Sequence, residues 1–136
     1  MLFRSLRLVE LLDCPVLPTM AGRAVVPSDH SHYLYGYGAG GDLARREADV
    51  VLVVGSRLGN LDLPYDKYWG DPAHQQIVQI DIDPRNMGVT RPLALGIVAD
   101  VDAAIQGLLR VLEGSHIRPK DPDALARSRE IGRAHV

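Results

Sequence analysis

The chain has 136 residues, 46% of them hydrophobic and 24% charged, which is the composition of an ordinary globular domain. Fifteen Lys and Arg against 17 Asp and Glu give a formal charge of -2 without a basic stripe, so nucleic acid is not an expected partner. The longest aliphatic run, Val50 to Val54, is far shorter than the roughly 20 apolar residues that a membrane span needs, and charged residues interrupt the apolar N-terminus. We therefore expect a cytoplasmic protein that does not enter a membrane.

The first third of the chain predicts one helix, one short strand and a long loop. Apolar residues at helical spacing indicate an amphipathic helix over residues 2–12, which ends before Pro15. The apolar piece 15–18 is interpreted as a buried strand that leads into the small-residue loop 19–22. Residues 25–41 have the composition of loops and turns.

The middle of the chain predicts a helix followed by three strands. Asp42 is placed to cap a helix over residues 42–48. The run 50–54 has five aliphatic residues, four of them β-branched, which is typical of a parallel strand buried on both faces. Further strands are expected over 77–82, which the following Asp-Pro pair ends, and over 95–99.

The rest of the pattern is helical. A short turn of helix is expected near 65–69, within an otherwise irregular connection. Asp100 stands at the N-cap position of an amphipathic helix over 101–112. The polar segment 115–136 is expected to be a C-terminal linker or tail with a weak helix over 122–131.

This order of elements is an α/β pattern with mostly parallel strands and crossover connections. The chain opens on a crossover helix without a preceding strand, so we expect that an upstream strand was cut away or belongs to a longer protein.

The ends of the predicted strands are the first place to look for a ligand site, because ligands of open α/β sheets bind outside the carboxyl ends of the strands. Carboxylates, one guanidinium and small-residue backbones gather there, and such groups can hold a nucleotide. The residues are Thr19, Met20, Gly55, Arg57, Asp81, Ile82, Asp100 and Val101. A structural explanation is equally open: Asp100 as a helix cap, residues 81–84 as a turn and Gly55 as a chain reversal.

Gly36, Gly38 and Gly41 have the GxGxxG spacing of dinucleotide-binding turns. A solid strand should precede that motif and an acidic residue should follow it after about 20 positions, and both are missing here. We therefore favour a glycine-rich turn before a helix, which can still approach a ligand.

The remaining reactive side chains predict neither catalysis nor a metal site. His30 and His32 alternate in a loop, but a metal needs three or four converging ligands, so they are interpreted as surface histidines. Ser56 lacks the GxSxG context of a catalytic serine. Cys14 is the only cysteine and is interpreted as a packing residue, and the three tyrosines of 33–37 either stack on a base or pack at an apolar edge or interface.

Four segments, taken together, resemble a known family. They are PVLPTMAGRAVVPSDHSHYLYGYG, READVVLVVGSRL, IVQIDIDPRNMG and IVADVDAAIQGLL. In this order and spacing they resemble the central domain of the thiamine diphosphate-dependent enzymes of the acetohydroxyacid synthase, pyruvate oxidase and 2-oxoacid decarboxylase group, over residues 5–113. The resemblance implies a three-layer Rossmann-like domain over 1–114, whose six-stranded parallel sheet is flanked by helices and here lacks the family's first strand.

The resemblance also implies partners. Family members place this domain between a pyrimidine-binding and a diphosphate-binding domain, which together hold thiamine diphosphate and magnesium. Neither domain is in this sequence, so the chain alone is not expected to be an enzyme. The parent would be an acetolactate synthase-like transferase or lyase acting on 2-oxoacids. A missing strand exposes a sheet edge, from which we expect a homo-oligomer.

Some family members bind FAD or an ADP-like nucleotide in this domain, so the resemblance implies either a real or a vestigial nucleotide site. The residues that match are Thr19, Met20, Gly36, Gly38, Gly55, Arg57, Asp81, Ile82, Asp100 and Val101. The alternative is a free-standing nucleotide-binding module or small oxidoreductase that uses the same sheet edge.

Overall fold

The computed structural model describes residues 2–59 and 66–134, which divide into two compact units. One unit comprises Arg45–Ala104, and the other comprises the residues before and after it. In the described part of the chain, no helix combines the length and the apolar character that a membrane span requires.

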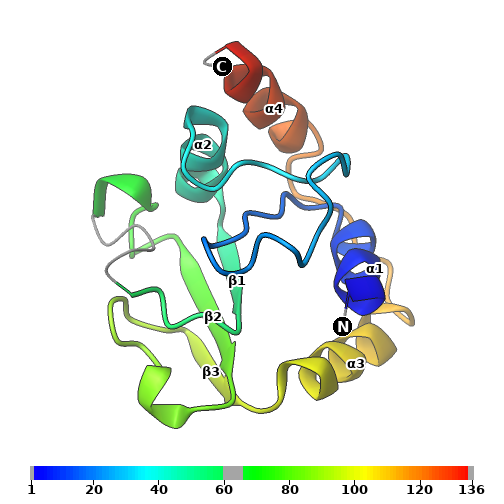
Figure 1. Ribbon diagram of the computed structural model, residues 1–136, viewed down its shortest axis with the longest axis vertical. Helices are drawn as coiled ribbons and strands as arrows, with labels where there is room; N and C mark the ends of the chain where they lie inside the picture. The colour runs from blue at the N-terminus through cyan, green and yellow to red at the C-terminus, as the bar shows by residue number, and fades with distance from the viewer. Residues whose placement is uncertain (1, 60–65, 135–136) are drawn as a thin grey trace. The chain divides into compact units, whose positions relative to one another are not determined.

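The Arg45–Ala104 unit is built on a parallel sheet. Its strands are β1 (Val50–Val54), β2 (Gln76–Asp81) and β3 (Leu95–Val98), in the order β1-β2-β3 (Figure 1). Val54 lies opposite Ile80 in the register of the first pair. All three strands were expected from their aliphatic runs, and the parallel arrangement confirms the α/β, Rossmann-like class.

The core of this unit lies against β1 and β2. Val53, Trp69 and Ile77 are its buried centre, and Ile80 is fully buried. Only Val53 of β1 is buried, Val50 is 52% exposed and the other three residues are partly exposed, so the expectation of a strand buried on both faces is wrong. β1 pairs only with β2 in this sheet, which leaves Val50 at an edge position.

Two short 3-10 helices connect the strands of this unit. The first, η1 (Asp66–Tyr68), agrees with the turn of helix expected near 65–69, of which residue 65 lies outside the described residues. The second, η2 (Pro84–Asn86), follows β2 and has Asp83 as its N-cap. Proline at the first helical position suits this start, because its missing N–H would have no partner there.

The helices are α1 (Leu2–Leu12), α2 (Ala39–Glu47), α3 (Val101–Leu112) and α4 (Ala124–Ala134). The expected bounds of α1 and α3 are confirmed. α2 begins three residues earlier than expected, because the carbonyl of Gly38 accepts a hydrogen bond from the N–H of Asp42 at 2.9 Å. Asp42 therefore lies in the first turn of α2 and is not its N-cap.

The strand expected over 15–18 is wrong. Val16 forms only an isolated parallel bridge with Tyr33, in which its N–H donates to the carbonyl of His32 at 2.9 Å and its own carbonyl accepts from Leu34 at 3.0 Å. Prolines at both ends of the segment remove the N–H groups that would extend the ladder. The described residues contain three strands in a sheet, where the family resemblance implied six.

The C-terminal segment contains a packed helix. α4 lies beside α2 in the same unit (Figure 1), and a methyl group placed on Gly40 would collide with the carbonyl oxygen of Ser128. Ser128 is 1% exposed, and the backbone of Gly132 also lies next to Gly40. Small residues thus allow the two helix backbones to approach each other.

Candidate functional site

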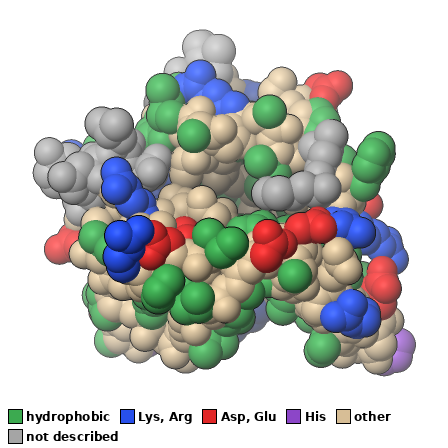
Figure 2. All heavy atoms as spheres, turned by 60° about the horizontal axis from the view of Figure 1, so that its bottom comes forward, with side chains coloured by type: hydrophobic (Ala, Val, Ile, Leu, Met, Phe, Trp, Pro, Cys, Tyr) green, Lys and Arg blue, Asp and Glu red, His purple; other side chains and the backbone are tan. Residues whose placement is uncertain are grey.

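Six of the predicted site residues lie at or just after the carboxyl ends of the three strands of the sheet. They are Gly55, Arg57, Asp81, Ile82, Asp100 and Val101. Figure 2 shows the molecule with the bottom of Figure 1 turned forward, and acidic and hydrophobic side chains lie next to one another on this face. The N–H of Gly55 donates to the carbonyl of Ile80 at 2.8 Å, and Ala99 donates to that of Asp81 at 3.0 Å, so the strand ends are bonded to each other.

Gly55 turns the chain at the end of β1. Its φ of +63° lies in the left-handed region that disfavours residues with a side chain. A methyl group at this position would also lie 3.3 Å from Cγ2 of Val101. The chain reversal expected for Gly55 is therefore a requirement of its backbone conformation and of its contact with the start of α3.

Asp81 is buried, with 6% of its surface exposed, and it holds the turn that follows β2. Its Oδ1 accepts hydrogen bonds from the N–H of Asp83 at 2.8 Å and from Nδ2 of Asn86 at 3.1 Å. The turn over residues 81–84, which was the structural alternative to a ligand-binding role, is thus present. The carboxylate of Asp81 therefore stabilises the loop that follows β2.

The side chain of Gln79 bonds to three different residues at this end, although it was not among the predicted site residues. It is 2% exposed, and its Nε2 donates to the carbonyls of Ser56 and Asn86, both at 2.9 Å. Its Oε1 accepts from the N–H of Gly88 at 3.0 Å. One amide in the central strand therefore fastens the loops that follow β1 and β2; a polar residue in the middle of an apolar strand was the available signal.

Asp83 and Arg85 form an ion pair on the same edge. Nη2 of Arg85 lies 2.7 Å from Oδ2 of Asp83, and the N–H of Arg85 also donates to Asp83 at 3.0 Å. The guanidinium, followed by this backbone N–H, lowers the pKa of Asp83, and the carboxylate raises the pKa of Arg85. Both charges are therefore already engaged with each other.

Asp100 caps α3 as the sequence predicted. Its Oδ1 accepts a hydrogen bond from the N–H of Ala103 at 3.0 Å, which satisfies one of the free donors of the first helical turn. Asp100 thus has a structural role, as Asp81 does.

Arg57 and Ile82 remain available to a ligand. Arg57 is exposed and has no hydrogen-bond or ion-pair partner among the described residues, and Ile82 is 68% exposed. Leu58, after Arg57, has a φ of +49°, and its carbonyl accepts a hydrogen bond from Oγ1 of Thr90 at 2.9 Å. The loop that carries Arg57 is therefore held in an uncommon backbone conformation, which is a frequent property of ligand-binding loops.

Four other predicted residues lie in the second unit and form a group of their own. Met20 donates its N–H to the hydroxyl of Tyr37 at 3.2 Å, and Oγ1 of Thr19 accepts from Gly22 at the same distance. A methyl group on Gly36 would lie 2.7 Å from the carbonyl oxygen of Pro18. The loop after Pro18 thus contacts the glycine turn of Gly36 and Gly38, which precedes α2.

The two loop histidines pair with the end of α1. Nε2 of His32 lies 2.8 Å from Oδ1 of Asp13, and Nε2 of His30 lies 3.5 Å from Oε1 of Glu10. Their side chains are 14% and 18% exposed, so these loop histidines, interpreted as surface residues, are partly buried and each lies beside a carboxylate. Within residues 2–59 and 66–134, no group of three or more His, Cys, Asp or Glu is arranged to hold a metal.

A parallel α/β sheet with polar loops at its carboxyl end defines a Rossmann-like domain. Residues 4–108 match the family model described as thiamine pyrophosphate enzyme, central domain, and the chain belongs to this family. The match agrees with the range 5–113 over which the sequence resembles the family.

Curated relatives include three named enzymes. Sulfoacetaldehyde acetyltransferase from Rhodobacter capsulatus is 36% identical over 112 residues, which are 77% of this chain and 19% of that protein. Oxalyl-CoA decarboxylase from Escherichia coli is 31% identical over 105 residues, 77% of this chain and 18% of that protein. Acetolactate synthase 1 from Zea mays is 35% identical over 113 residues, which are 80% of this chain and 17% of that protein. The chain spans less than a fifth of the length of these relatives.

Proposed function

We propose that the chain is a structural, non-catalytic central domain of an acetolactate synthase-like enzyme that uses thiamine diphosphate. The observation that carries the proposal is that the polar side chains at the carboxyl end of the sheet form hydrogen bonds within the domain itself. Asp81, Gln79 and Asp100 all bond to backbone groups of their own domain. Asp81 and Gln79 are buried and Asp100 is exposed, and a domain whose polar side chains fix its own loops is suited to support neighbouring domains.

In this proposal the cofactor belongs to other domains of the parent. Thiamine diphosphate and magnesium would be held by a pyrimidine-binding and a diphosphate-binding domain, with which this domain packs in a cytoplasmic homo-oligomer. The described residues present no cluster of metal ligands for a magnesium-diphosphate group, so no chemical step is assigned to them. The parent would be a transferase or lyase acting on 2-oxoacids; the relatives are named for acetyl transfer, decarboxylation and acetolactate synthesis.

Calorimetric titration with thiamine diphosphate and magnesium chloride tests the proposal. We expect no saturable binding by the purified chain, whereas a full-length relative such as the maize acetolactate synthase serves as the positive control. Saturable binding by the chain itself would contradict a purely structural role.

A nucleotide site is the second candidate, and two exposed residues that follow neighbouring strands favour it: Arg57, whose guanidinium has no partner among the described residues, and Ile82. A guanidinium binds phosphate, and an apolar side chain can cover an adenine or flavin ring. One relative acts on oxalyl-CoA, and coenzyme A contains an adenosine diphosphate group. FAD or an ADP-like nucleotide would then lie along Gly55, Arg57, Asp81 and Asp100.

Titration with FAD, ADP and NAD tests the second candidate. We expect FAD or ADP to bind and the substitution Arg57→Gln to weaken that binding. Arg85→Gln is the matched control, since it removes a charge that Asp83 already pairs. A flat titration with all three compounds would leave the structural role alone, and binding of NAD only would favour a free-standing nucleotide-binding module, which the relatives do not support.

A further inference from the structure

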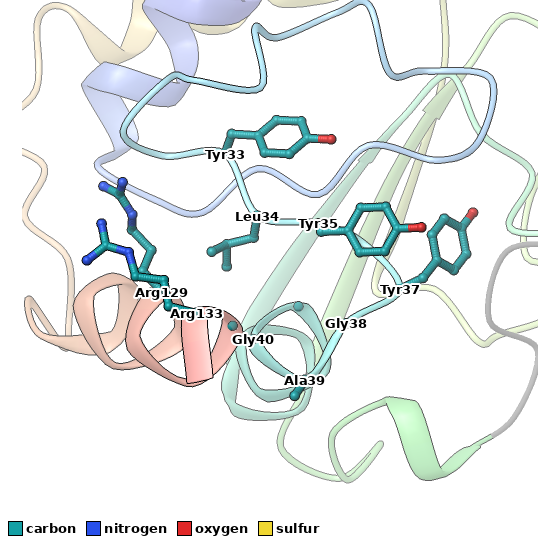
Figure 3. A pocket seen from close by; sticks show the side chains of 11 residues that line it. Tyr33, Leu34, Tyr35, Tyr37, Gly38, Ala39, Gly40, Arg129 and Arg133 are labelled. Atoms are coloured by element: carbon teal, nitrogen blue, oxygen red, sulfur yellow. The ribbon is translucent and has the colours of Figure 1, made fainter. Parts of the chain in front are cut away.

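A cavity of about 500 Å³ lies in the unit that contains α2 and α4 (Figure 3). The tyrosine-rich loop 33–37, the first turn of α2 and one face of α4 line it. This volume falls within the range of about 300–1,000 Å³ that is usual for small-molecule sites. The tyrosines were predicted either to stack on a base or to pack at an apolar edge or interface, and no sequence pattern indicated the residues of α4.

The charged residues of the cavity are all positive. Arg129 and Arg133 lie one turn apart on α4, and Figure 3 shows both side chains extending from α4 toward the loop that carries Tyr33 and Leu34. None of the described residues that line the cavity is acidic. A ligand that fills it would therefore be an anion.

The two arginines differ in how they are held. Nη1 of Arg129 donates to the carbonyl of Ser31 at 2.7 Å, which fixes its guanidinium at the cavity. Arg133 is exposed and has no partner among the described residues. One preset guanidinium and one free guanidinium can take an anion together without breaking an existing ion pair.

The start of α2 adds to the positive character of the cavity. Ala39, Gly40 and Gly41 line it, and the first backbone bond of this helix runs from Asp42 to Gly38. The preceding N–H groups have no partner inside the helix, and they carry the positive end of its dipole. Gly40 and Gly41 are themselves buried, and a methyl group on Gly40 would collide with the carbonyl oxygen of Ser128, so these glycines allow the close packing of α4 against this helix start.

The opposite part of the cavity is apolar and aromatic. Leu34 is 5% exposed and, in Figure 3, extends toward α4. The rings of Tyr35 and Tyr37 meet edge to face, with their centroids 5.9 Å apart, and the hydroxyl of Tyr37 is fixed by the N–H of Met20. In Figure 3 the side chains of Tyr35 and Tyr37 extend away from the arginines, and both tyrosines are among the residues that line the cavity.

We propose that this cavity binds a phosphate ester with a planar apolar body. A phosphate dianion matches two guanidinium groups in charge and offers enough oxygens for both, whereas a carboxylate satisfies one. The apolar body would lie against Leu34 and the tyrosine rings. Of the residues predicted to bind a nucleotide, the cavity lining contains Gly38 and not Arg57, and the proposal does not depend on the function proposed above.

Calorimetric titration of the full chain with phenyl phosphate tests the proposal, with inorganic phosphate and benzoate as comparison ligands. We expect phenyl phosphate to bind at submillimolar concentration, and both comparison ligands to bind more weakly. Arg129→Gln and Arg133→Gln should each weaken the binding by about tenfold or more, as expected for the loss of a charge-assisted hydrogen bond. Circular dichroism verifies that α4 still forms in each variant.

Two control variants carry the same change elsewhere. Arg127→Gln removes a charge on the same helix, where Arg127 pairs with Asp121 at 2.7 Å outside the cavity, and it should leave the affinity unchanged. Arg110→Gln, which removes an exposed charge on α3 outside the cavity lining, should also have no effect. No binding at millimolar phenyl phosphate, equal affinity in Arg133→Gln, loss of binding in Arg110→Gln, or benzoate binding as tightly as phenyl phosphate would each overturn the proposal.

Discussion

Replacement of Gln79 by leucine should destabilise the protein strongly, although leucine has a similar size and suits a buried strand. The change removes three hydrogen bonds, to Ser56, Asn86 and Gly88, and leaves three backbone groups without their side-chain partner. Each such group costs about 1–3 kcal/mol when it is shielded from water. Because these three are only partly buried, we take the lower end, which gives a loss of about 3 kcal/mol in the free energy of unfolding.

Urea unfolding followed by tryptophan fluorescence measures this loss. Trp69 is the single tryptophan, is 7% exposed and lies in the core of the same unit. With a slope of about 2 kcal/mol per molar urea, the midpoint should fall by about 1.5 M. Gln76→Leu is the matched control, because it makes the same change at an exposed position of the same strand and should shift stability by less than about 0.5 kcal/mol. Equal midpoints for the two variants would refute the anchoring role of Gln79.

The remaining predictions concern titration and capping. Burial, with a smaller contribution from the charge of Asp13, raises the pKa of the Cys14 thiol to about 11. Alkylation of Cys14 in the native chain at pH 8 should therefore be about a hundredfold slower than that of a free thiol, and its rate should increase with pH. Equal alkylation rates for Cys14 in the native and the unfolded chain would contradict the raised pKa. The pKa of Asp83 is lowered by Arg85, so their pair should stabilise the fold at neutral pH and weaken as the pH falls through the lowered pKa; in a carboxylate NMR titration, Arg85→Gln should move this midpoint upward, and an unmoved midpoint would contradict the pairing. Asp100→Ala should cost about 1 kcal/mol in urea unfolding, whereas Asp100→Asn should keep most of the cap; equal losses would show that the cap is not the cause.

The fold class could be predicted because its signals are local. Five aliphatic residues in Val50–Val54 favour a buried parallel strand wherever they occur, and Asp100 before an apolar helical stripe indicates a cap without reference to the rest of the chain. For the segment 15–18 the local signal predicted the wrong structure. It is apolar enough for a strand, but a ladder needs N–H donors, and its prolines lack them.

The sequence by itself therefore determined the α/β class, the three strands of the sheet, the helices α1 and α3 and the family. Only the tertiary structure decided what the polar residues do, because a hydrogen bond between distant residues leaves no local pattern. It assigned Asp81 to the turn after β2 and His32 to Asp13, and it identified Gln79, whose partners lie on two different loops. It also brought Arg129 and Arg133 to the tyrosine loop, almost a hundred residues away in sequence, since the packing of small residues between α2 and α4 is a property of the folded chain.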